Sequence, residues 1–244
     1  STFKRGINFL NIPTTLLAMT DAAIGGKTGV DLDNFKNQIG IINSPVGIYY
    51  DSNFLSTLPK NELISGFAEV LKHGLIKSNS YWSKCTNISF EHLNWEEVIL
   101  GSVEIKCSVV KRDPHEKGER RLLNFGHTIG HAIEKLSGER HGYCVAVGMV
   151  LEIDPKNILI RNLIISCLSK YRLPTETNDN LDTVRLIEFI KKDVRNDNNN
   201  FFCEIYDNKI FHYRAGTNWM RNLSYSHFLY LNELLEIVNE LCKD

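Results

Sequence analysis

The sequence predicts a two-part protein, with an α/β segment over residues 1–58 followed by a mainly α-helical domain over residues 59–244. The first part consists of short apolar stretches interrupted by glycine and proline. This pattern is typical of strands joined by tight loops. From about Pro59 onward, apolar residues recur at helical spacing over much longer segments. At 244 residues the chain is long enough to bury a sizeable core.

The first part contains a predicted strand, a brief helix, a glycine-rich loop and a second strand, over residues 6–13, 14–23, 24–29 and 46–50. Pro13 lacks a backbone N–H and should therefore end the first strand. The hydroxyls of Thr14 and Thr15 can cap the helix that follows.

The second part contains five predicted helices, over residues 60–77, 93–112, 124–137, 143–153 and 183–193. Gly138 is a typical helix stop, because glycine readily adopts the left-handed conformation that ends many helices. We expect a polar loop, a short strand pair and a closing helix to follow, over residues 193–200, 201–213 and 228–242.

The bulk composition favours a globular protein that acts on small molecules. Hydrophobic residues make up 43% and charged residues 23%, and the net charge of −1 offers no attraction for nucleic acid or an anionic membrane. No run of 18 apolar residues is present. The six cysteines are scattered and form no C-x-x-C pair, which favours reduced thiols in the cytoplasm.

Three histidines give the strongest chemical signal. His127 and His131 are four residues apart, so a helix places both on one face, and His141 follows just beyond that helix. Imidazole is a common metal ligand near neutral pH, whereas structural zinc sites normally use cysteine. The pattern therefore predicts a catalytic metal centre, although the spacing leaves open which two histidines bind the ion.

A second helix segment, residues 66–74, supplies a carboxylate and a cation. Glu69 and Lys72 lie about 60° apart on a helix, at the usual ~100° per residue. One glutamate with two histidines would leave a coordination position open for substrate, as a catalytic metal requires.

Cations accompany these motifs. Lys27 follows two glycines, and a glycine-rich turn with a lysine suits phosphate binding, although the spacing is not that of a P-loop. Arg120 and Asn124 lead directly into the histidine helix, where a guanidinium fork would suit a carboxylate or phosphate.

Taken together, these segments resemble the 3-dehydroquinate synthase family. The motifs that carry the resemblance are Pro13–Asp21, Gly25–Val30, Lys36–Gly40, Ala68–Gly74 and Leu123–Glu134. They occur in the family's order and approximate spacing, from residue 1 to about residue 152. The resemblance implies a fragment of a Rossmann-like NAD-binding domain, followed by a helical domain that binds metal and substrate.

The implied reaction converts 3-deoxy-D-arabino-heptulosonate 7-phosphate, a phosphorylated sugar acid, to 3-dehydroquinate and phosphate in the shikimate pathway of aromatic amino acid biosynthesis. The implied cofactors are NAD and a divalent metal, usually Zn²⁺ with Co²⁺ possible, and the implied assembly is a homodimer. No nucleic acid or membrane partner is expected.

The resemblance also implies a role for individual residues. The metal ligands would be Glu69, His127 and His141. Glu116 and His131 would serve as acid/base residues, and Lys72 as a further catalytic residue in contact with substrate. The substrate would be held by Arg5 (reaching the partner subunit's site), Asp21, Lys27, Asn37, Lys106, Arg120 and Asn124. NAD would contact Thr14, Thr15, Lys36, Phe54, Leu55, Ser56 and Thr57.

The chain departs from the family pattern at several points. The family's glycine-rich dinucleotide turn is expected upstream of Arg5, so we expect little turnover from these 244 residues alone. Tyr143 stands where a glutamate usually follows His-Gly, Glu119 where an apolar residue is usual, and Val194-Arg195 where paired lysines are usual.

Three alternatives remain open at this stage. One is another sugar phosphate cyclase, although Lys106 and Arg120 favour a substrate that carries a carboxylate. A metal-dependent polyol dehydrogenase would have less need for so many cations. An inactive, truncated fragment would need to retain neither metal nor NAD.

Overall fold

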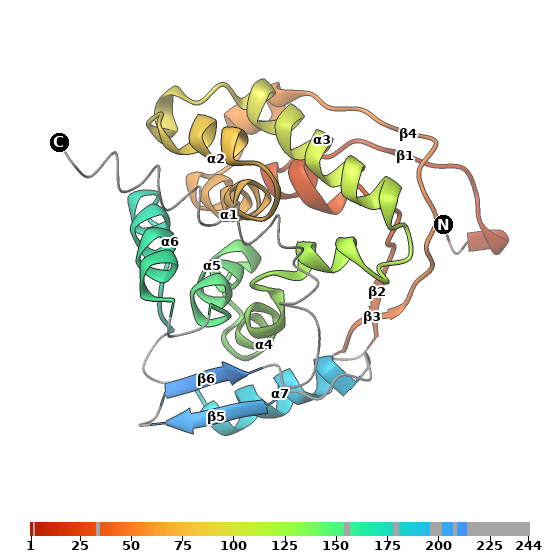
Figure 1. Cartoon of the computed structure of the whole chain (residues 1–244). Coiled ribbons are helices and arrows are strands. Elements are labelled where there is room, and N and C mark those ends of the chain that lie inside the picture. Colours follow the sequence, from red (N-terminus) through yellow and green to blue (C-terminus); the bar gives the residue numbers. More distant parts are fainter. Residues whose placement is uncertain are drawn as a thin grey trace. The chain divides into compact units, whose positions relative to one another are not determined.

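A computed structural model describes residues 1, 3–32, 35–153, 157–177, 181–195, 202–206 and 209–213. For residues 5, 31–32, 35–38, 183, 191–195, 202–206 and 209–213 it describes the backbone alone. By packing, the chain divides into two compact units, Ser1–Leu122 and Leu123–Asp244. The predicted boundary near residue 58 separates an NAD-binding domain from a metal-binding domain, whereas the two units are defined by packing alone. The domain boundary therefore stays a prediction. Helices predominate in both units, and Figure 1 labels them.

The first unit begins with short elements. Its strands are β1 (Leu10–Asn11), β2 (Val30–Leu32), β3 (Phe35–Ile39) and β4 (Gly47–Ile48), with a π-helical segment over Ala18–Ala22 and 3₁₀ helices over Phe3–Arg5 and Ser52–Thr57. β1 pairs in parallel with β4, as expected for two strands of an α/β segment, although both are shorter than predicted. The β2–β3 antiparallel pair follows the glycine-rich loop and was not predicted.

Three helices complete this unit: α1 (Lys60–Lys77), α2 (Asn79–Thr86) and α3 (Trp95–Arg112). A further 3₁₀ helix covers Phe90–His92. α1 packs against α2, α3 and the Ala18–Ala22 segment. Every residue from Ile64 to Ile76 is buried.

The 3₁₀ helix Glu119–Asn124 spans the point where the two units meet along the chain. The second unit contains α4 (His127–Ser137), α5 (His141–Leu151), α6 (Ile158–Lys170), α7 (Thr183–Arg195) and the antiparallel pair β5 (Phe202–Tyr206) and β6 (Lys209–Tyr213). The predicted strand pair over 201–213 is confirmed, and α7 runs three residues into the predicted polar loop, to Arg195. α6 was not predicted, and the closing helix over 228–242 lies outside the described residues.

The α4–α5 hairpin is the centre of the second unit. α4 packs on α5 and α7, and a buried cluster joins the three helices: Ile129, Ala132, Ile133, Cys144, Val147, Leu186 and Ile190. A Cβ at Gly148 would overlap the carbonyl oxygen of Gly126, so only glycine permits this close approach. The predicted helix start at 124 is wrong by three residues, because Gly126 has a left-handed φ of 78° and α4 begins after it.

None of the helices among the described residues is both long enough and apolar enough to cross a bilayer.

Candidate functional site

Helix α1 of the first unit carries a buried charge cluster. Glu69 and His73 are fully buried and Lys72 is 1% exposed. Glu69 and Lys72, three residues apart on one face of α1, form an ion pair. Ionised groups are buried at high cost unless they are paired, so this pair accounts for the presence of both charges inside the unit.

Asp21 and Lys106 complete this cluster. The Lys106 Nζ lies 2.6 Å from the Asp21 carboxylate and also donates to the Asp21 carbonyl oxygen at 2.6 Å. His73 Nε2 lies 3.6 Å from the same carboxylate. The structure therefore joins Asp21 from the N-terminal segment with α1 and α3. We call Asp21, Glu69, Lys72, His73 and Lys106 the α1 charge cluster.

The cluster shifts the ionisation of its members. Burial alone would raise the pKa of Asp21, but the charge of Lys106, assisted by Lys72, holds that pKa well below its usual range. Burial lowers the pKa of His73, and contact with Asp21 only partly offsets it. Burial also lowers the pKa of Lys106. Donor atoms of Asp21, Glu69 and His73 lie within 4.8 Å of one another, but the two lysines already balance the two carboxylates.

A second group surrounds the glycine-rich loop, also within the first unit. Lys27 forms an ion pair with Glu116. Arg120 is only 3% exposed, and its guanidinium donates to the carbonyl oxygens of Gly25 at 2.9 Å and Pro114 at 2.8 Å. Arg120 therefore ties the loop that carries Lys27 to the segment that carries Glu116.

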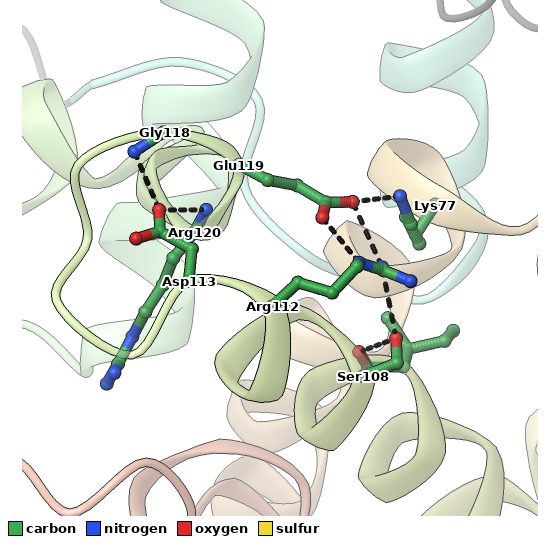
Figure 2. A network of polar contacts seen from close by, with 8 residues as sticks. Lys77, Ser108, Arg112, Asp113, Gly118, Glu119 and Arg120 are labelled. Atoms are coloured by element: carbon green, nitrogen blue, oxygen red, sulfur yellow. Dashed lines mark hydrogen bonds and ion pairs between the residues drawn. The ribbon is translucent and has the colours of Figure 1, made fainter.

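Two carboxylates shape the segment between α3 and Arg120 (Figure 2). Asp113 accepts hydrogen bonds from the backbone N–H groups of Lys117, Gly118 and Arg120 at 2.9, 2.7 and 3.1 Å. Although partial burial acts the other way, these bonds lower the pKa of Asp113. Glu119 pairs with Lys77 at the end of α1 and accepts from Arg112 Nε at 2.6 Å. The segment is thus fixed to the ends of both long helices.

The three histidines of the second unit lie together. The ring centroids of His127 and His131 are 5.1 Å apart, those of His127 and His141 5.3 Å, and those of His131 and His141 5.8 Å. The sequence prediction that these imidazoles converge is therefore matched by the geometry of this unit. Gly138, with φ of 68°, ends α4 and turns the chain so that His141 opens α5 beside α4.

The hydrogen bonds of two histidines define which nitrogen can bind a metal. His127 Nδ1 lies 3.1 Å from the Phe125 carbonyl oxygen, and His141 Nδ1 lies 3.1 Å from Glu134 Oε2. A carbonyl oxygen and an ionised carboxylate can only accept, so Nδ1 carries the proton in both rings. The lone pair is then on Nε2, which suits both rings to divalent zinc or cobalt.

A carboxylate also caps the helix that carries His127. Glu152, at the end of α5, accepts from the N–H groups of Gly126 at 2.7 Å and Ile129 at 3.1 Å. Gly126 has no side chain to cap α4, and Glu152 supplies the missing acceptor from the neighbouring helix.

Comparison with known proteins identifies the family. A profile described as 3-dehydroquinate synthase N-terminal matches residues 1–65, and one described as 3-dehydroquinate synthase C-terminal matches residues 66–196. The 3-dehydroquinate synthase of Parabacteroides distasonis is 44% identical over 161 residues, which cover 63% of this chain and 46% of that protein. That of Acetivibrio thermocellus is 44% identical over 191 residues, which cover 72% and 52%. The chain belongs to the 3-dehydroquinate synthase family. It spans about half the length of these two relatives.

A solved structure supports the same fold. A 2-deoxy-scyllo-inosose synthase, complexed with carbaglucose-6-phosphate, NAD⁺ and Co²⁺, is 25% identical with a TM-score of 0.71, covering 87% of this chain and 66% of that one. The predicted family membership is confirmed, and the expected fold class is confirmed at the level of the sugar phosphate cyclases.

The remaining residues implied by the 3-dehydroquinate synthase resemblance are spread over both units. Thr14, Ser56 and Thr57 are exposed, and Phe54 is 39% exposed. Thr15 accepts from the Ala18 N–H at 3.2 Å and so acts as the predicted cap. Leu55 is buried in the core, so only its backbone can reach a ligand. Asn124 is exposed in the second unit, and the side chains of Arg5, Lys36 and Asn37 lie outside the described residues.

Residues that orient others were not predicted from the sequence. His73, Asp113, Glu134 and Glu152 were assigned no role. Asp113 had a usable signal, since an aspartate just after a helix often accepts from nearby backbone N–H groups. Glu134 and Glu152 act across the α4–α5 turn, and helical spacing gives no register across a turn.

Proposed function

We propose that this protein is part of a 3-dehydroquinate synthase that converts 3-deoxy-D-arabino-heptulosonate 7-phosphate to 3-dehydroquinate and phosphate, with NAD and a divalent metal. The observation that carries the proposal is the histidine cluster of the second unit, with three ring centroids 5.1–5.8 Å apart. It occurs in a chain whose curated relatives carry that name at 44% identity.

The proposed metal ligands are Glu69, His127 and His141, assigned on the family motifs. The donor chemistry fits Zn²⁺ or Co²⁺, because His127 and His141 each have a protonated Nδ1 and a lone pair on Nε2. When bound, the ion would polarise substrate oxygens and NAD would accept and return a hydride.

The proposed anion-binding residues are cations held in place by the first unit. Lys27 belongs to the glycine-rich loop and pairs with Glu116, while Arg120 donates to Gly25 of the same loop. A lysine with a guanidinium suits a phosphate dianion or a carboxylate. Lys106 is fixed on Asp21, so this pair would present a cation and an acceptor to substrate hydroxyls. The remaining substrate contacts proposed are Arg5, Asn37 and Asn124.

The proposed acid/base residues are Glu116 and His131, with Lys72 as a further catalytic residue. The role of these groups is to hold or move a proton at an oxygen or carbon of the bound sugar acid. His131 is exposed at the histidine cluster and Glu116 is half-buried. NAD would contact Thr14, Thr15, Lys36 and residues 54–57. The homodimer, in which Arg5 reaches the partner's site, and the cytoplasmic location expected from the cysteines also stay proposals.

The decisive test measures metal, ligand and product together. The chain is incubated with Zn²⁺, NAD and the sugar-acid phosphate, while phosphate release, dehydroquinate formation and binding heat are followed. We expect metal-dependent binding of the sugar-acid phosphate, lost in His127→Asn and kept in His92→Asn, which changes an exposed histidine outside the motifs. Turnover by the 244 residues alone is expected to be low. Absence of metal-dependent binding would refute the proposal.

A second candidate is a sugar phosphate cyclase whose substrate lacks a carboxylate, since the inosose synthase fold matches at a TM-score of 0.71. A sugar phosphate without a carboxylate, offered in competition, separates the two. Preference for this sugar phosphate would move the assignment to this class, whereas dependence on Lys106 and on the substrate carboxylate supports dehydroquinate formation.

A further inference from the structure

The α4–α5 hairpin of the second unit is held by a carboxylate at each end. Glu152 caps the first turn of α4 at the open end of the hairpin, and Glu134 contacts His141 at the end where Gly138 turns the chain. Glu134 lies in the third turn of α4, while His141 is the first residue of α5. The contact thus spans the turn between the two helices.

We propose that Glu134 is a positioning residue for His141: its carboxylate accepts from Nδ1, fixes the tautomer and ring orientation, and thereby presents Nε2 to the metal. This inference rests on the proposed metal role of His141. The Oε2–Nδ1 distance is 3.1 Å, and both side chains are half-buried, which strengthens a charge-assisted hydrogen bond relative to bulk water.

The geometry favours a positioning role over direct coordination. A metal bound on Nδ1 would lie about 2.0–2.1 Å from that nitrogen, in the plane of the ring. In the structure this direction is taken by the Glu134 oxygen at 3.1 Å, within hydrogen-bonding geometry. While Glu134 accepts from the Nδ1–H, that nitrogen has no lone pair for a metal, so His141 would bind through Nε2. Donor atoms of His131, Glu134 and His141 lie within 4.8 Å of one another, so coordination by Glu134 itself is the alternative that the experiment must separate.

The two ligand candidates are oriented by different means. His127 is fixed through the Phe125 carbonyl oxygen, which no side-chain substitution removes. His141 depends on a side chain, Glu134, that carries negative charge and raises the electron density of the ring. Tyr143, which follows His141-Gly142, lies under Arg140 with the guanidinium carbon 5.9 Å from its ring centroid. Tyr143 carries no negative charge, and Glu134 places one against His141 Nδ1.

The test uses two variants of Glu134 and one control variant. Glu134→Gln keeps an acceptor oxygen but loses the charge, Glu134→Ala loses both, and Glu139→Gln changes an exposed carboxylate nearby as the matched control. Zn²⁺ and Co²⁺ affinities are measured by chelator competition, and long-range ¹⁵N–¹H NMR of the metal-free chain reports the protonated nitrogen of His141.

If Glu134 positions His141, metal affinity should decrease stepwise across the Glu134 variants. Metal affinity should fall about 10–100-fold in Glu134→Ala and less in Glu134→Gln, with the Co²⁺ spectrum of each loaded variant unchanged. The His141 Nδ1–H tautomer should dominate in wild type and become mixed in Glu134→Ala, while Glu139→Gln matches wild type throughout. Circular dichroism confirms that each variant keeps its helices.

Two results would overturn the proposal. Wild-type affinity and tautomer in Glu134→Ala would show that the carboxylate does not orient the ring. A changed Co²⁺ spectrum in the loaded Glu134→Gln variant, or complete loss of metal binding in that variant, would make Glu134 a ligand instead. The proposed metal role is checked separately with His127→Asn and His141→Asn: if both retain wild-type metal binding, the metal site itself fails, and the Glu134 variants then measure only the tautomer.

Discussion

The two units hold their polar site residues in place by different means. In the first unit, four members of the α1 charge cluster are buried and Asp21 is half-buried, and its two carboxylates and two lysines balance one another. In the second unit, His127 and His141 are half-buried and His131 is exposed, and their orientation comes from single hydrogen bonds on Nδ1. Removal of one charged member from the first arrangement should destabilise the fold strongly, because it leaves another buried charge without its partner. The second tolerates substitution but depends on small orienting contacts.

Removal of one lysine from the α1 charge cluster should have the largest effect. Lys106→Met leaves the Asp21 carboxylate without its closest cation, so we expect the free energy of unfolding to fall by about 3–5 kcal/mol. Urea denaturation measures the change. Lys84→Met, which breaks an exposed ion pair with Glu97, is the matched control and should leave stability unchanged.

A double variant sharpens this prediction. Lys106→Met combined with Asp21→Asn removes both charges, so most of the loss should be recovered. Equal effects of Lys106→Met and Lys84→Met would show that the buried pair contributes no more than an exposed one, and the contrast between the two units would then fail.

Loss of the carboxylate cap in the second unit should have a smaller effect. Glu152→Ala removes the acceptor for the N–H groups of Gly126 and Ile129, and we expect a loss of about 1–2 kcal/mol in the free energy of unfolding. Hydrogen exchange at these two amides should accelerate, while amides in the middle of α5 change less. Unchanged exchange at Gly126 would mean that Glu152 does not cap α4; Glu139→Ala is the exposed control.

The buried histidine of the first unit should make stability depend on pH. Burial lowers the pKa of His73 in the folded chain below its unfolded value of about 6.5. The unfolded chain therefore binds this proton first, so stability falls as the pH drops below about 6.5, by at most about 1.4 kcal/mol per pH unit for one proton. The neighbouring charges of Asp21, Glu69, Lys72 and Lys106 are already balanced and do not invert this sign.

Comparison with a histidine-free variant isolates this contribution. The free energy of unfolding of wild type and of His73→Asn is measured by urea denaturation from pH 7.5 to pH 5. The difference in free energy of unfolding between the two proteins should become smaller toward low pH. Parallel curves would show that His73 takes up its proton equally in both states. His92→Asn, at an exposed position, controls for the other histidines.

The sequence predicted long helices well and contacts across turns poorly. The range of α1 matched the structure at both ends, because a proline precedes it and its apolar periodicity is long. α2 was missed because it is short and begins directly after α1, where Ser78 accepts from the Tyr81 N–H at 3.2 Å. The site residues that lie within motifs were found, whereas Glu134 and Glu152 needed the packing of α4 on α5, which no spacing rule provides.

The smallest expected effect is at the surface of the first unit. Glu119 is paired with Lys77 and Arg112, and although partial burial acts the other way these cations hold its pKa below the usual value. Solvent screens such pairs, so Glu119→Gln should cost less than about 1 kcal/mol of stability by urea denaturation. Because Glu119 anchors the segment that carries Arg120 to Lys77 and Arg112, the variant should loosen this segment and weaken binding of inorganic phosphate or the sugar-acid phosphate, measured by calorimetry. Glu96→Gln, on the exposed start of α3, is the control. A stability loss as large as that of Lys106→Met, with unchanged anion binding, would show that surface pairs of this unit act like the α1 charge cluster.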